Sequence, residues 1–236
     1  MANSAFAQFQ GQITMRIYSE NDGRDEESTL NMFVTADRIM FQGESAFGID
    51  DGFDAEGLLI RNDKKDFVLL TGDNSALQVT KKEIESFIGL ANGWGGSSTS
   101  KYTEDKEPNY RYTERTKKIL GYDCTELVLE GDDDDGYISV WLTPGIDINW
   151  GMLTESWEGL DEETDRAFRT SQDAIFTGKS FPMLVEVHSR KEGSKVVAEV
   201  TSLNKSSIAK AMVEIPQGVK ILSYGDFLLK MMTGGR

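Results

Sequence analysis

The residue types that most often carry nucleophilic or metal chemistry are scarce, since the chain has one histidine and one cysteine. His188 lies in an alternating segment beside Glu186 and Arg190, on the more polar face, so we interpret it as a surface histidine among charged residues. Cys124 stands early in a predicted strand, with no cationic neighbour in sequence to lower its pKa. It is therefore predicted to be a half-buried structural thiol, with a reactive thiol as the alternative. A zinc site of the usual Cys/His kind is excluded.

The segment Gly178-Lys179-Ser180 resembles the end of a phosphate-binding P-loop, but its surroundings do not fit one. Such a loop needs a glycine where Asp173 stands, and it must open a helix, whereas Phe181-Pro182 leads into a strand. The charge of the whole chain also opposes phosphate, because 40 acidic and 25 basic residues leave a net charge of −15. Nucleic-acid binding depends on Lys and Arg that neutralise phosphates, so nucleic acid is excluded as a partner and anionic lipid headgroups are disfavoured.

Carboxylates are the abundant chemical group, and they are most concentrated at 132–135, just before Gly136. Calcium prefers several oxygen ligands, but an EF-hand loop with Gly136 at its sixth position would begin at Gly131 and end at Leu142, neither of which is a carboxylate. We expect a solvated hairpin turn there, with weak calcium binding as the alternative, and likewise at 50–52. With forty acids, a pair placed for acid–base catalysis cannot be identified. No catalytic residue, metal or cofactor is predicted.

The elements that would position a site are predicted to be β-strands. Apolar and polar residues alternate from Ile13 to Tyr18, and again from Leu30 to Val34 after an acidic turn at 20–25. A period of two gives a strand one apolar and one polar face, and regular short strands joined by turns indicate an antiparallel meander. Further strands are predicted at 38–42, 57–61, 66–71, 110–119, 122–130, 137–143, 181–190, 195–203 and 211–215.

One helix is clearly predicted. Thr80 and Glu83 form a T-x-x-E capping box, and the apolar residues at 84, 87, 88 and 91 then follow at helical spacing as far as Gly93. The stretch 93–108 is glycine, serine and charge, so we expect a mobile loop there. Two shorter helices are predicted, one after Asp161 and an amphipathic one over 226–232.

The length of 236 residues suits one large β domain, which we place at 10–236 after a flexible amino terminus over 1–9. Within that terminus Ala5-Phe6-Ala7 has the A-x-A form of a signal-peptidase site. The remnant of a leader is one interpretation, and an ordinary amino terminus is the other. No run of 18 apolar residues predicts a transmembrane helix.

Four segments in order resemble a known bacterial family of exported proteins of uncharacterised function. These are Gly121-Tyr122-Asp123-Cys124, the strand 139–143, the strand 181–186 beginning Phe-Pro, and 215–218 with sequence Ile-Pro-Gln-Gly. The resemblance is clearest over 113–220, and the family in turn is similar to the outer-membrane lipoprotein carriers of the LolA and LppX type. The long glycine-serine loop and the strong acidity depart from those carriers.

The resemblance implies a mainly β fold: a strongly curved antiparallel sheet, or incomplete β-barrel, whose apolar concave face is covered by helices and can hold acyl chains. It also favours an exported protein, periplasmic or outer-membrane associated. The first functional hypothesis is thus a non-enzymatic carrier or binding protein for a hydrophobic small molecule, a lipid or a lipoprotein.

The second hypothesis is an envelope scaffold that has a filled core and binds another envelope protein through its loops, and the third is a carboxylate-based hydrolase. For the first, the apolar strand positions are the candidate ligand lining, although they could equally form a filled core. They are Ile13, Met15, Ile17, Leu30, Met32, Val34, Ile138, Val140, Leu142, Val185 and Val187.

Overall fold

The computed structural model describes residues 8–21, 24–49, 53–71, 74–86, 110–130, 136–160, 165, 168–169, 172–177, 179–189, 193–226 and 229. Strands predominate in these residues, and they form one open, largely antiparallel sheet with few helices, which confirms the predicted fold class. The predicted mobile loop near 93–108 and the acidic turns at 50–52 and 132–135 lie outside the described residues.

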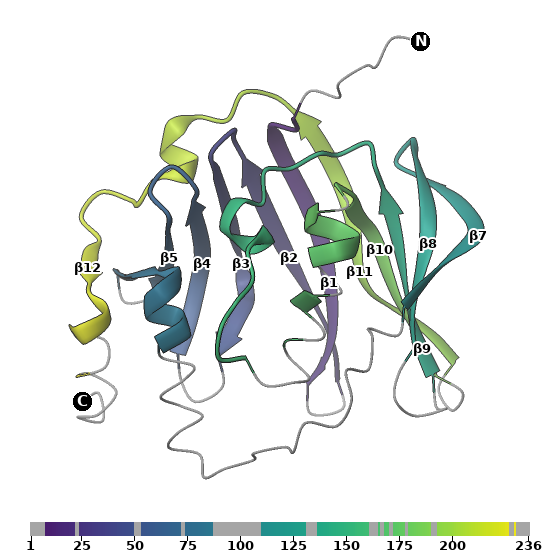
Figure 1. Cartoon of the computed structure of the whole chain (residues 1–236), viewed down its shortest axis with the longest axis horizontal. Helices are drawn as coiled ribbons and strands as arrows, with labels where there is room; N and C mark the ends of the chain where they lie inside the picture. Colours follow the sequence, from purple (N-terminus) through teal and green to yellow (C-terminus); the bar gives the residue numbers. More distant parts are fainter. Residues whose placement is uncertain are drawn as a thin grey trace.

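Twelve strands build the sheet, and Figure 1 labels most of them. They are β1 (Gly11–Asn21), β2 (Arg24–Val34), β3 (Arg38–Ile49), β4 (Phe53–Arg61), β5 (Asp66–Thr71), β6 (Ser75–Thr80), β7 (Tyr110–Ile119), β8 (Tyr122–Glu130), β9 (Gly136–Thr143), β10 (Phe181–Ser189), β11 (Gly193–Lys205) and β12 (Lys220–Leu222).

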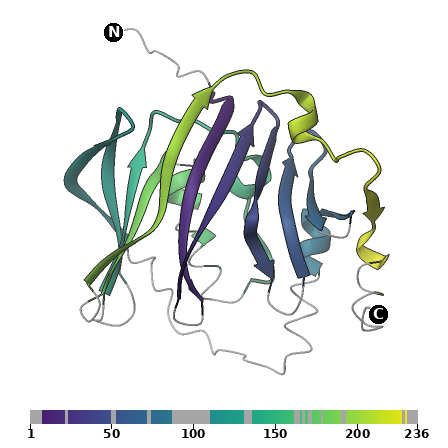
Figure 2. The same cartoon turned by 180° about the vertical axis from the view of Figure 1, so that it is seen from behind.

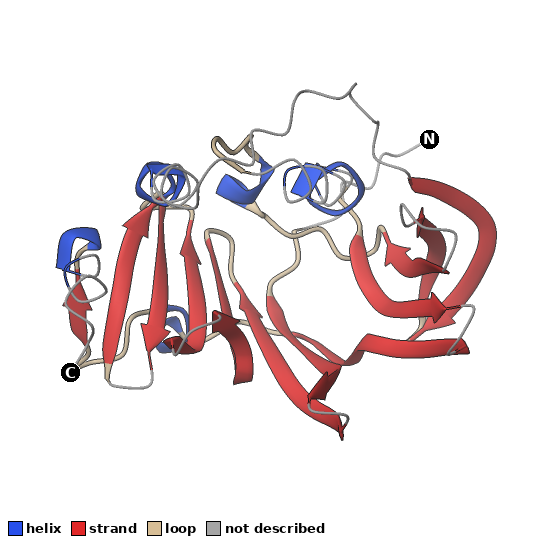
Figure 3. Cartoon of the chain, turned by 90° about the horizontal axis from the view of Figure 1, so that it is seen from below, coloured by secondary structure: helices blue, strands red, loops and turns tan. Residues whose placement is uncertain are grey.

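The strand order is β12-β6-β5-β4-β3-β2-β1-β11-β10-β9-β8-β7, so the first strand lies in the middle and β12 and β7 are the two edges. Every pairing is antiparallel except that of β12 with β6. The sheet does not close. Seen from below, its β7–β11 end curves round toward the side that carries most of the helices, which we call the concave side (Figure 3).

Turn chemistry explains where the predicted strands end. Ile119 pairs with Tyr122 across a two-residue turn in which Leu120 and Gly121 have φ of 50° and 85°. Positive φ at both central residues is typical of a type I′ turn, whose twist matches that of the flanking strands. Glycine adopts such angles without strain. The predicted bounds of β7 and β8 are therefore confirmed to the residue.

Three features of the local structure differ from what the sequence predicts. The segment predicted as a strand at 211–215 contains instead a 3-10 turn, η3 (Lys210–Val213), which packs on the sheet rather than joining it. Strands β6 and β12 were not predicted. Phe9, expected within a flexible terminus, is buried in the main core, and its backbone N–H donates to the Asp147 carbonyl at 2.6 Å.

The predicted capping box is confirmed. The Thr80 backbone N–H donates to the Glu83 carboxylate at 2.7 Å, and the Glu83 N–H donates back to the Thr80 hydroxyl at 3.3 Å. Helical backbone runs from residue 81 to the end of the described segment at 86. A second box lies in the tail, where Ser223 and Asp226 exchange the equivalent bonds, and helical backbone begins at residue 224, before the predicted start at 226.

Two segments cover the two faces of the sheet. The described residues between 144 and 180, which include η1 (Gly151–Thr154) and the π-helical η2 (Gln172–Thr177), lie over the concave face (Figures 1 and 3). The segment 206–219, with η3, crosses the opposite, convex face, as the view from behind shows (Figure 2). There Val213 is buried with Phe33, Met40 and Leu59. The segment 206–219 is called the strap below.

Arg38 fastens the strap to the sheet. Its guanidinium donates to both oxygens of Asp63 at 3.0 and 2.7 Å and to the Val213 carbonyl at 3.1 Å, and it pairs with Glu214 at 2.7 Å. Hydrogen bonding to Arg38 lowers the pKa of both Asp63 and Glu214 below their ordinary values of 3.8 and 4.5. The strap is thus tied by a charge network that requires both acids to be ionised.

Arg38→Ala is expected to lower the free energy of unfolding by about 2–3 kcal/mol, because it removes charge-assisted bonds and leaves a carbonyl unpaired. A depressed folded pKa stabilises the protein above the unfolded value and stops doing so as pH falls through the folded value. The difference between the native protein and Arg38→Ala should therefore be full above pH 4.5 and shrink as the pH falls below 3.8.

Urea unfolding at several pH values measures this difference. Arg111→Ala is the matched control, since Arg111 makes a single exposed ion pair with Glu130, and it should cost no more than about 1 kcal/mol. A loss for Arg38→Ala that is independent of pH would show that the two acids do not carry the attachment.

Candidate functional site

The apolar residues of the concave face form continuous rows across the sheet. The pairing of β7, β8, β9, β10, β11 and β1 aligns Tyr112, Leu127, Val140, Val185, Ala198 and Ile17 in one row. A second row aligns Leu129, Ile138 and Val187. Directly opposed residues share one face of a sheet. By this register all eleven residues predicted as ligand lining lie on the same face.

The upper part of this face is packed. Ile13, Met32 and Val34 are fully buried in the main core, and Met15 packs against them. The covering segment supplies Ile146, Ile148, Trp150 and Met152 to the same core. Four of the predicted lining residues therefore contact protein side chains in this region.

Asn62 and Gly151 hold the cover in place. The Asn62 amide donates to the Asn149 carbonyl at 3.0 Å, and its oxygen accepts from the Met152 N–H at 3.4 Å. Gly151 has φ of 51°, and a Cβ there would lie 1.9 Å from the Asn62 side chain. Only glycine satisfies both the backbone angle and this close approach. Beside it, the Trp150 ring packs on Phe176 at 4.9 Å and on Phe181 at 6.4 Å.

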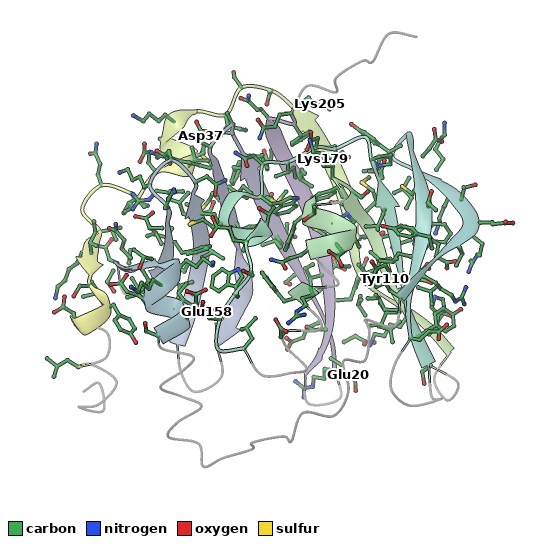
Figure 4. The ribbon with its side chains drawn as sticks, in the orientation of Figure 1. Glu20, Asp37, Tyr110, Glu158, Lys179 and Lys205 are labelled. Carbon is green, nitrogen blue, oxygen red and sulfur yellow. The ribbon has the colours of Figure 1, made fainter. Side chains whose placement is uncertain are left out.

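The lower part of the face is more open. Val140 and Leu142 are buried with Leu127 under Ala174 of η2, and Val185 packs at their edge. Next to them Ile138, Val187 and Tyr112 are 37%, 36% and 53% exposed. Ile17 and Leu30 are half-buried on the same face. Tyr110, labelled in Figure 4, also packs against this cluster from β7.

We call the accessible part of this face the open strip: Ile17, Leu30, Tyr112, Ile138, Val185 and Val187. Partial burial raises the pKa of the Tyr112 hydroxyl, and the neighbouring Tyr110 and Asp173 add to the rise. Exposed apolar residues that lie together on a protein surface mark a candidate contact surface for something non-polar.

The opposite face of the same strands carries a polar cluster around Glu126. This buried carboxylate accepts from Ser139 at 2.7 Å, from Thr113 at 2.8 Å and from Arg115 at 2.8 Å. Burial alone would raise the pKa of Glu126, but the bonds from Ser139 and Thr113 and the charge of Arg115 outweigh it and lower that pKa. With three donors in place, Glu126 is a structural anchor rather than a general acid.

The contacts of His188 and Cys124 indicate a structural role for each. His188 stacks on Tyr137 with ring centroids 4.4 Å apart, and its Nδ1 lies 2.6 Å from the Ser194 hydroxyl. Cys124 is buried more deeply than expected, and burial raises the pKa of its thiol. Among the described residues no group of three or more His, Cys, Asp or Glu could hold a metal ion. Nor is any described helix long and apolar enough to cross a membrane.

Comparison with solved structures gives similarities of low score. The chain is 16% identical to PNGF-II over 94% of its own length and 33% of that chain, with a TM-score of 0.44. It thus spans about one third of the PNGF-II chain. A LolA superfamily protein from Nitrosomonas europaea is 10% identical over 89% of this chain and 91% of that one, with a TM-score of 0.31.

A putative outer membrane lipoprotein-sorting protein domain from Vibrio parahaemolyticus is 10% identical over 86% and 89% of the two chains, with a TM-score of 0.30. At such scores these likenesses do not define what the chain binds. No curated protein matches it. A family model, in contrast, matches residues 9–219, which is most of the chain. The protein therefore belongs to the family described as domain of unknown function DUF4412.

Proposed function

We propose that this protein is a non-enzymatic binding or carrier protein of the bacterial cell envelope, and that it holds a hydrophobic ligand, a lipid or an acylated protein, on the open strip. The observation that carries the proposal is the alignment of apolar side chains across six strands, with Ile138, Val187 and Tyr112 still accessible. Each CH₂ group buried there contributes about 0.8 kcal/mol, so the free energy of binding should grow with the length of acyl chain that the strip covers.

Export and an envelope location belong to the same proposal. They rest on the resemblance of four ordered segments to a family of exported proteins. The acidity of the chain supports recognition of the non-polar part of a ligand rather than of an anionic headgroup, because 40 acids would repel such a group.

The probe for the proposed site is the methyl ester of a fluorescent long-chain fatty acid, which carries no negative charge for the acidic chain to repel. Ile138→Asp and Val187→Asp each place a charge in the open strip and should weaken its binding at least about tenfold, equivalent to ~1.4 kcal/mol. Both positions are partly exposed, so the fold should tolerate the change. Titration by fluorescence gives the dissociation constants, and thermal unfolding checks that the variants remain folded.

Ile221→Asp is the matched control, because Ile221 is 52% exposed on β12, at the sheet edge opposite β7. It should bind the probe like the native chain. Equal binding by all three variants, or no binding by the native chain, would refute the carrier proposal.

A filled-core scaffold is the second candidate, and the observation that favours it is the dense packing of the covering segment on the upper face. A scaffold of this kind would bind no fatty acid ester, and the same titration therefore separates the two proposals.

A further inference from the structure

A groove on the convex face is formed by residues of β2, β3 and β4. It has a volume of about 630 Å³, within the range of small-molecule sites. Leu30 and Met32 of β2 pair with Met15 and Ile13 of β1, which lie on the concave face. Thr29 and Asn31 alternate with them along β2 and therefore belong to the convex face. The described residues that line the groove include Glu27, Ser28, Thr29, Asn31, Gln42 and Glu56.

The groove lies where three neighbouring strand pairings are irregular: β2 with β3, β3 with β4, and β4 with β5. Strands β2 and β3 pair only as far as Leu30 and Gly43, and β3 with β4 is interrupted between Gln42 and Phe47. The register of β4 with β5 also shifts between Ala55 and Gly57, which makes Glu56 the extra residue of a bulge. Bulges redirect a side chain out of the regular alternation and are common beside binding sites.

Several polar groups in the groove are held in place by neighbours. Asn31 Oδ1 accepts from Gln12 at 3.1 Å and from Thr14 at 3.0 Å, so the two hydrogens of its amide nitrogen are left for another acceptor. Glu27 is fixed by Arg16 Nε at 2.8 Å. Arg16 is in turn positioned by the Tyr18 hydroxyl, which donates to Glu199 at 2.7 Å.

The lining decides the class of ligand. Among the described residues that line it are two carboxylates but neither a cation, which disfavours anions, nor an apolar side chain, which disfavours lipids. Its volume is far larger than a metal ion, and no cluster of three ligating residues occurs in the described chain. The side chains of the groove offer both hydrogen-bond acceptors and hydrogen-bond donors: the Glu56 carboxylate, the Asn31 and Gln42 amides and the Thr29 hydroxyl.

We propose that this groove binds a saccharide. Each sugar hydroxyl both donates and accepts, and carboxylates, carboxamides and hydroxyls meet both needs at once. Glu27 is committed to Arg16, while Glu56 has no ion-pair partner in the part of the chain that the structure describes.

Saturation-transfer NMR with chitotriose, maltotriose and mannotriose tests the proposal, at concentrations up to roughly 10 mM so that weak binding is detected. At least one of the three should bind the native chain saturably. Glu56→Gln and Gln42→Ala should each raise its dissociation constant about tenfold, since each removes hydrogen-bond capacity without a change in the core. Glu114→Gln, at an exposed position on β7, is the matched control and should bind like the native chain.

Spermidine serves as a cationic probe in the same experiment. If it binds and depends on Glu56 while none of the sugars does, the site recognises cations and the saccharide proposal is overturned. Absence of binding by all three sugars, or sugar binding that neither substitution weakens, overturns it as well. Ile138→Asp on the other face should leave sugar binding unchanged, so failure here is distinguishable from failure of the carrier proposal.

Discussion

Replacing Asp66 by alanine is expected to lower the free energy of unfolding by about 3–5 kcal/mol, the cost of leaving a buried charge without its partner. Asp66 accepts two bonds from Arg61 at 2.6 Å each, and a third from Gln78 at 2.7 Å. The two charged side chains are only 4% and 6% exposed. In the variant the Arg61 guanidinium would stay in the interior unpaired. The melting temperature should fall by roughly 6–20 °C.

Chemical and thermal unfolding of Asp66→Ala measure this loss. In Arg61→Ala/Asp66→Ala no unpaired charge remains, so the double variant should lose clearly less than the two single losses added together. Asp123→Ala breaks the exposed pair with Lys118 and should change stability by less than about 1 kcal/mol. A loss for Asp66→Ala as small as that of Asp123→Ala would contradict the view that this pair organises the β4–β5 hairpin.

Trp150→Ala is the second substitution with a large expected effect, about 3–5 kcal/mol, because it removes a buried aromatic ring from the core. The ring lies between the cover and the sheet, against Phe176 and Phe181. Its loss would open a cavity under η1 and loosen the segment that limits access to the concave face. We therefore expect Trp150→Ala to expose apolar surface as well as to unfold more easily.

Urea unfolding measures the stability, and binding of an environment-sensitive dye measures the exposed surface. Tyr137→Ala removes another stacked aromatic ring, on His188 at 4.4 Å, but from a more exposed site. It should cost no more than about 1.5 kcal/mol. Equal losses for the two variants would mean that the cover does not pack as described.

The strand elements were largely predictable because alternation and turn residues are local signals. The β7–β8 hairpin shows this best, since Gly121 marks a turn that ends both strands. Strand β12 gave no such signal, because three residues in parallel pairing with β6 are stabilised by a contact distant in sequence. The predicted strand at 211–215 was wrong because Arg38 draws Val213 into the strap, where its carbonyl bonds to a side chain rather than to a strand.

Membership of the apolar face was also a local property, and the register places all eleven predicted residues on it. The division of that face into a packed and an open part was not predictable. It depends on where Trp150 and Ala174 pack on the sheet. Both residues belong to a segment in which apolar residues show no clear periodicity. The convex groove left no trace in the sequence, since it arises where the β2–β3 and β3–β4 pairings break together.

A fatty acid methyl ester that carries a photoreactive diazirine at its chain end is the most direct probe of the open strip. After irradiation and digestion, mass spectrometry locates the label along the chain. Binding as proposed predicts label on the peptides that contain Ile138 and Val187, competed away by the unlabelled ester. Label confined to the convex face, or spread over the chain without competition, would contradict the claim that these strands receive a non-polar ligand.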